Sequence, residues 1–168
     1  PGVQALFEQA LSRLQGRGAT LVPVSFPELA QAPRAFFQLY APEFAAEHGH
    51  LLPDRAALMG DDVRGDLERC CRSNPAKLEA AQDVRERFTA ALQAALGDLD
   101  GLICPTTPLV AQPHGTPGAH RYLLYTCPFN LAGVPALSIP MGEIDGLAAG
   151  LQLVGRRNAD ATVLSLGR

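Results

Sequence analysis

The feature that most constrains this chain is a pair of short apolar segments, residues 136–139 and 151–154, with Asp145-Gly146 between them. Adjacent Asp and Gly tolerate the positive φ angles that tight hairpin turns require. The pattern therefore predicts a β-hairpin. A third apolar segment, Leu102 to Cys104, is stopped by Pro105 and predicts another short strand. The sheet formed by these strands must bury a face against other elements.

Helical periodicity supplies those elements. It is strongest over residues 74–97, where Asn74 can cap the N-terminus, Gly97 can end the helix, and one apolar face recurs: Leu78, Ala81, Val84, Phe88, Leu92, Ala95 and Leu99. Weaker patterns predict helices over 3–14, 28–48, 54–72, 126–131 and 160–166, with Thr126 and Gly133 bounding the fourth and Pro33 and Pro42 interrupting the second. Residues 19–26 predict a strand. We expect a single α/β domain, residues 1–168, with a mixed sheet flanked by helices.

Composition excludes several classes of protein. The 168 residues are 47% hydrophobic and 18% charged, as in globular domains, and the net charge of −3 gives no reason to expect a nucleic acid or an anionic membrane as partner. No apolar run approaches the roughly 20 residues of a membrane span. Four cysteines, Cys70, Cys71, Cys104 and Cys127, lack disulfide or zinc spacing. This usage favours a reduced, cytoplasmic compartment.

No residue pattern marks an internal active site. None of the serines lies in G-x-S-x-G or in a Gly/Ser-rich loop, and the only lysine is Lys77. Cys127 is one alternative nucleophile, at a helix N-terminus and preceded by His114 and His120, but packing as a small apolar residue is the favoured interpretation. The histidines have no metal-ligand spacing, so we expect neither a metal nor a cofactor.

Three segments carry a resemblance to a known family. Asp100, Leu102–Cys104 and Pro105-Thr-Thr-Pro108 form the first. The second is Thr126-x-Pro128-x-Asn130-Leu131-x-Gly133-x-Pro135-Ala136, and the third is Gly150-Leu-Gln-Leu-Val-Gly155. Together they resemble the C-terminal part of amidase signature enzymes, which are serine hydrolases of carbon–nitrogen bonds.

The resemblance implies a function and also a gap. Family enzymes use a Lys, a bridging Ser and a nucleophilic Ser beside a Gly-rich oxyanion loop, and no position here matches any of the three. We therefore assign no catalytic residue. The resemblance implies that this part of the family contributes core strands and a wall of the substrate pocket, for which Tyr125, Thr126 and Asn130 are the candidates.

The resemblance also suggests a subgroup. The glutaminase subunits of glutamyl-tRNA amidotransferases usually carry an Asp three places before the Thr, where this chain has Leu123. A general amidase, acting on a small-molecule amide when intact, is thus favoured. We expect the chain to be inactive alone and either to self-associate or to pair with the missing N-terminal half. The alternative is a non-catalytic remnant that serves as a binding or structural module.

Overall fold

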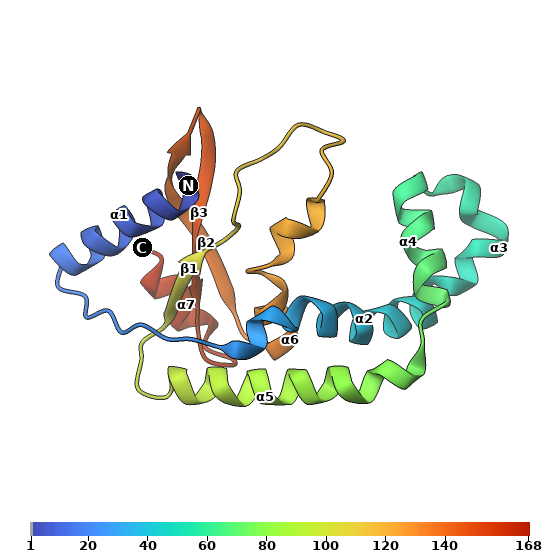
Figure 1. The fold of residues 1–168 in the computed structure, drawn as a ribbon, viewed down its shortest axis with the longest axis horizontal. Helices are drawn as coiled ribbons and strands as arrows, with labels where there is room; N and C mark the ends of the chain where they lie inside the picture. The colour runs from blue at the N-terminus through green and yellow to red at the C-terminus, as the bar shows by residue number, and fades with distance from the viewer. Residues whose placement is uncertain (1) are drawn as a thin grey trace.

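A three-stranded antiparallel sheet organises one end of the molecule (Figure 1). The computed structural model describes residues 2–168. The strands are β1 (Leu102–Pro105), β2 (Ala136–Ile144) and β3 (Leu147–Val154), in the order β1-β3-β2. The hairpin predicted from Asp145-Gly146 is confirmed, with φ values of 53° and 76° at these two residues. The expected α/β class is confirmed, whereas the sheet expected to be mixed is antiparallel in both of its described pairings.

Seven helices surround and extend this sheet within residues 2–168. Their bounds are α1 (Gly2–Gly16), α2 (Ala32–His48), α3 (Leu52–Arg55), α4 (Asp61–Cys71), α5 (Leu78–Leu96), α6 (Cys127–Ala132) and α7 (Asp160–Leu166). Figure 1 shows α5 running along one side of the molecule beside α2, with α3 and α4 at the end opposite the sheet. No helix in this range is both long and apolar enough to span a bilayer.

The two faces of the sheet are covered by different helices. On one face, α5 and α6 contribute a core in which Phe88 is fully buried and contacts Phe26 and Phe129 at ring-centroid distances of 5.8 and 6.4 Å. On the other face, α1 packs Val3 and Ala10 against the strands. This apolar burial is the main driving force that holds the helices on the sheet.

The strongest predicted helix starts and ends where its local signals indicated. The side chain of Asn74 accepts a hydrogen bond from the amide of Ala76 at 3.0 Å, just before a short 3₁₀ turn and α5, and α5 ends at Leu96, one residue before Gly97. Gly133, with φ of 65°, follows the end of α6. Thr126 precedes α6 as expected, but its hydroxyl forms no capping hydrogen bond.

Two further expectations, an interrupted second helix and a strand over residues 19–26, were wrong. α2 is continuous through Pro42, because α4, α5 and α6 all pack on it and stacked rings at helical spacing (Phe36, Tyr40 and Phe44) line it. Residues 19–26 form no strand: within residues 2–168 no neighbouring strand pairs with them, and a lone extended segment cannot satisfy its backbone groups in a ladder. Val22 and Val24 in this segment are 55% and 40% exposed.

The outer strands of the described sheet are β1 and β2. β1 and β2 each pair with β3 on one side and with no other described strand on the other side. Thr106 and Gly155, which flank the ladders, donate to Gly150 and Pro135 at 2.8 and 3.0 Å. Because antiparallel strands bond through alternate residues, every second backbone amide of β1 and β2 points away from β3. Among the described residues, both strands therefore present open edges.

Candidate functional site

A group of polar side chains lies on the sheet face that also carries α5 and α6. Antiparallel register places Cys104 of β1 and Ser138 of β2 on either side of Gln152 in β3. Because register partners point to the same face, the three side chains are neighbours. Thr106, just beyond β1, places its hydroxyl oxygen 2.6 Å from that of Ser138. We call Cys104, Thr106, Ser138 and Gln152 the polar cluster.

Gly150 makes room for the hydroxyl pair of the polar cluster. A Cβ at this position would lie 2.5 Å from the Ser138 hydroxyl oxygen and 2.6 Å from that of Thr106. Both distances are shorter than any real carbon–oxygen contact, so a side chain there would push the two hydroxyls apart. The first glycine of the Gly-Leu-Gln-Leu-Val-Gly segment is therefore required by the packing of the cluster.

Gln152 links the sheet to the segment before α6. Its side chain is 4% exposed, and its Nε2 donates to the carbonyl oxygen of Tyr125 at 2.7 Å and contacts the Cys104 sulfur at 3.4 Å. A buried amide that lost these partners would pay a desolvation cost of roughly 1–3 kcal/mol. Gln152 therefore fixes the position at which the chain enters α6.

Of the three predicted pocket residues, Tyr125 and Thr126 lie directly before α6, and Asn130 lies within it. Tyr125 and Thr126 are half-buried, and Asn130 is exposed. The backbone N–H of Asn130 donates to the backbone carbonyl of Thr126 at 3.3 Å. The structure brings the Tyr125 backbone to the polar cluster through Gln152. Among the residues that the structure describes, no hydrogen bond joins the side chain of Thr126 or Asn130 to the cluster. Their place in a substrate pocket stays a prediction.

Neither of the two cysteines in the core has the properties of an activated thiol. Cys127 is 1% exposed, and burial raises the pKa of its thiol. Burial also raises the pKa of the Cys104 thiol, and the hydrogen bond from Gln152 offsets only part of this increase. A nucleophilic thiol needs access and a lowered pKa. The structure therefore supports the packing interpretation of Cys127; the side chain of His120, one suggested base, lies outside the described part.

The polar cluster has hydrogen-bonding groups but no group suited to general acid–base chemistry. It offers two hydroxyls, a carboxamide and a protonated thiol, and it contains no carboxylate, imidazole or amine. Such groups donate and accept hydrogen bonds at fixed positions, whereas general acid–base chemistry needs a group that titrates near the working pH. By themselves these four side chains therefore do not make a complete catalytic centre.

The sequence analysis did not predict that Thr106, Ser138 and Gln152 lie side by side in the fold. Two signals pointed to it: Gln152 is a polar residue inside an otherwise apolar strand, and Thr106 belongs to the Pro-Thr-Thr-Pro segment. The contacts themselves join residues 32 and 27 positions apart, so no local pattern could reveal them.

Comparison with known proteins agrees with this geometry. A glutamyl-tRNA(Gln) amidotransferase subunit of Symbiobacterium thermophilum is 30% identical over 195 aligned positions, which cover 99% of this chain and 40% of that protein. A crystal structure of an amidase superimposes with a TM-score of 0.89 at 30% identity, covering 99% of this chain and 40% of its own. A vestigial protein complex, described as revealing the evolutionary origins of an s-triazine catabolic enzyme, superimposes at 0.83 with 26% identity, covering 99% and 38%.

The chain thus spans about 40% of the length of these relatives. The relatives include both an amidase and part of an amidotransferase, so the preference for a general amidase stays a prediction. The sequence pattern of the Amidase family matches residues 1–164, nearly the whole chain. This chain belongs to the amidase family.

Proposed function

We propose that this chain is the C-terminal part of a hydrolase that cleaves a small-molecule carboxamide to a carboxylate and ammonia or an amine. The observation that carries the proposal is the convergence of three segments. Pro-Thr-Thr-Pro, the segment before α6, and Gly-Leu-Gln-Leu-Val-Gly are far apart in the sequence, yet they meet at the polar cluster. Segments that converge on one point of a sheet face are well placed to form a wall of a ligand pocket.

In this proposal the catalytic groups come from outside residues 1–168. The polar cluster has no base, and Lys77, the only lysine of the chain, lies at the start of α5 and not in the cluster. An acyl-transfer mechanism needs a nucleophile, a base and donors for the oxyanion. We infer that the chain is inactive alone and that a polypeptide corresponding to the other part of its relatives completes the site.

Gln152 has a defined part in this proposal. By holding the Tyr125 carbonyl, it would orient the segment that carries Thr126 and Asn130 toward the substrate. It would be a positioning residue, since its amide contacts the chain and not the reacting atoms. Exchange of Gln152 for Leu should then lower amide turnover in the completed enzyme without changing the pH dependence of that turnover.

A serine-directed fluorophosphonate probe tests the proposal. The purified 168-residue chain should not be labelled. When it is co-expressed with a polypeptide from the preceding reading frame that carries a Lys and a Gly/Ser-rich loop, that polypeptide should be labelled and ammonia should be released from a carboxamide. Stoichiometric labelling of the 168-residue chain by itself would contradict the proposal.

A second function, a non-catalytic binding or structural module, has one observation in its favour. The chain resembles, at 26% identity, a structure described as a vestigial protein complex. A remnant of this kind would keep the sheet and helices while the catalytic part was lost. A stop codon directly upstream of Pro1 would favour it, and an upstream frame that encodes the Lys and the Ser-rich loop would exclude it.

A further inference from the structure

A groove runs between α2 and α5, on elements that the polar cluster does not use. Its volume is about 450 Å³, and its lining includes four small or apolar side chains: Ala35, Ala76, Ala80 and Val84. Of these, Ala35 and Val84 are buried. The walls carry long polar side chains on both sides: Gln31, Arg34 and Gln38, and Lys77, Asp83 and Arg87.

Helical spacing brings these wall residues to the groove. Arg34 and Gln38 are four positions apart on α2, as are Asp83 and Arg87 on α5, so each pair shares one helix face. Lys77 and Arg87 are ten positions apart, which corresponds to about 15 Å along the axis of α5. The α5 side of the groove therefore carries two separated cations, Lys77 just before the helix and Arg87 within it.

The lining of the groove carries a net positive charge. Three cations face one carboxylate, that of Asp83, although the chain has a net charge of −3. Within residues 2–168, none of the three cationic side chains forms an ion pair or a hydrogen bond. On α4, by contrast, Arg64 is 2.6 Å from Asp61, and Arg69 pairs with Asp66. The cationic side chains that line the groove are therefore free to contact a bound anion, as are those of several arginines outside it.

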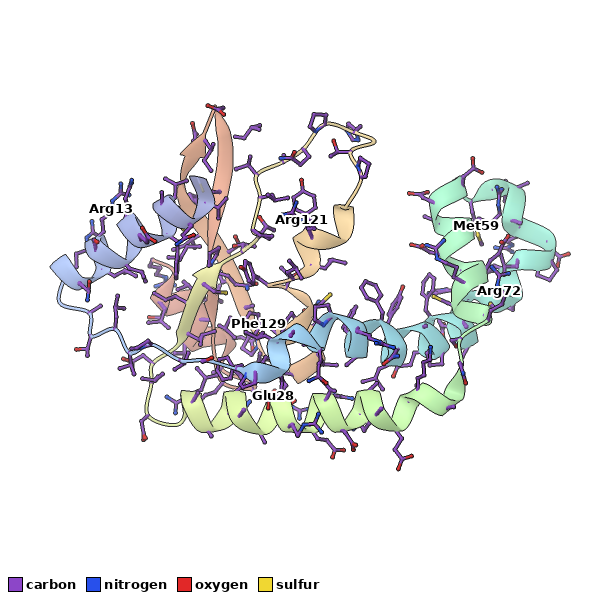
Figure 2. All side chains as sticks on the ribbon, viewed as in Figure 1. Arg13, Glu28, Met59, Arg72, Arg121 and Phe129 are labelled. Carbon is purple, nitrogen blue, oxygen red and sulfur yellow. The ribbon has the colours of Figure 1, made fainter. Side chains whose placement is uncertain are left out.

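We propose that this groove binds a small polyanion, a polyphosphate or a polycarboxylate. The guanidinium groups of Arg34 and Arg87 can each hold two oxygens of such a group, and the Lys77 ammonium can hold a third charge at the start of α5, where the helix dipole also favours an anion. A volume of about 450 Å³ lies in the range of small-molecule sites. Glu28, on the turn before α2 (Figure 2), is not among the residues that line the groove.

Calorimetric titration of the 168-residue chain with tripolyphosphate and, separately, with citrate at low ionic strength tests the proposal. At least one should bind saturably, and the tighter of the two identifies the anionic group preferred. Arg34→Gln and Arg87→Gln should each weaken that binding about tenfold, the value of one charge-assisted hydrogen bond. Asp83→Asn should tighten it about threefold, because it removes the one negative charge of the groove.

Arg157→Gln is the matched control, since Arg157 is exposed and lies in the turn before α7, outside the groove. It should leave the dissociation constant unchanged. Circular dichroism of each variant should show unchanged helix content, because Arg34, Asp83 and Arg87 are all exposed. Absence of saturable binding of both anions, or equal weakening by Arg157→Gln and Arg87→Gln, would overturn the proposal.

Discussion

Gly150 shows how one missing side chain shapes the polar cluster. Gly150→Ala would place a methyl group against the hydroxyls of Thr106 and Ser138 and force them apart. We expect the variant to be destabilised by about 1–3 kcal/mol, the usual cost of overpacking a close contact. Urea unfolding followed by circular dichroism measures the change.

Gly16→Ala is the matched control for this experiment. A Cβ at Gly16, the last residue of α1, would meet nothing within 4 Å, and its backbone does not require positive φ. Its stability should equal or slightly exceed that of the parent chain, since Ala favours helix over Gly. Equal destabilisation at both positions would remove the argument that the cluster requires a glycine.

Cys127 and Cys71 are expected to differ strongly in reactivity. Cys71 is exposed, whereas Cys127 is 1% exposed and has a raised thiol pKa because it is buried. Iodoacetamide at pH 8 should label Cys71 first, as peptide mass spectrometry can follow, and urea should abolish the difference. Equal rates in the folded chain would instead support an activated thiol at Cys127.

The same burial sets a pH dependence of stability. The folded chain keeps the Cys127 proton to a higher pH than the unfolded chain does, because the native pKa is raised. The contribution of this thiol is therefore constant below the unfolded pKa of about 8.5 and is lost as pH rises through the native pKa. Cys104 acts in the same direction. Part of the alkaline loss of stability should disappear in Cys127→Ala.

Helix α5 contributes three fully buried side chains, Phe88, Leu92 and Leu96, to the core on its face of the sheet. Phe88 is fully buried there between Phe26 and Phe129 (Figure 2 labels Phe129), so Phe88→Ala should cost about 3–5 kcal/mol of unfolding free energy. Phe37→Ala on α2 is the matched control, because Phe37 is 43% exposed. We expect the control to cost clearly less in the same urea titration; equal losses would mean that α5 does not hold the core.

The whole molecule carries open edges and exposed apolar side chains. β1 and β2 end the described sheet, and Val22 and Leu58 are 55% and 84% exposed. Unpaired strand edges and apolar surface favour association. Sedimentation velocity should show oligomers that grow with concentration and that disappear when a complementary polypeptide is co-expressed. A monomer at all concentrations would contradict this expectation.

Some of this structure could be predicted from local sequence and some could not. Asp145-Gly146, Asn74 and Gly133 each determine the backbone within a few residues, and the hairpin and helix limits that they predict are confirmed. Two local patterns gave wrong predictions. Pro42 does not interrupt α2, because a helix packed on its neighbours tolerates a proline, and residues 19–26 form no strand, because a strand needs a pairing partner. Propensity yields to tertiary packing at both places.

The sequence by itself determined the family, through three segments whose residue types and spacings recur together, and most of the local elements. Only the tertiary structure decided that Thr106 meets Ser138, that Gln152 holds the Tyr125 backbone, and that cations from α2 and α5 share one groove. The physical reason is the range of the interactions. Turns and caps are satisfied within a few residues, whereas a site is assembled from residues that register and helix packing bring together across the chain.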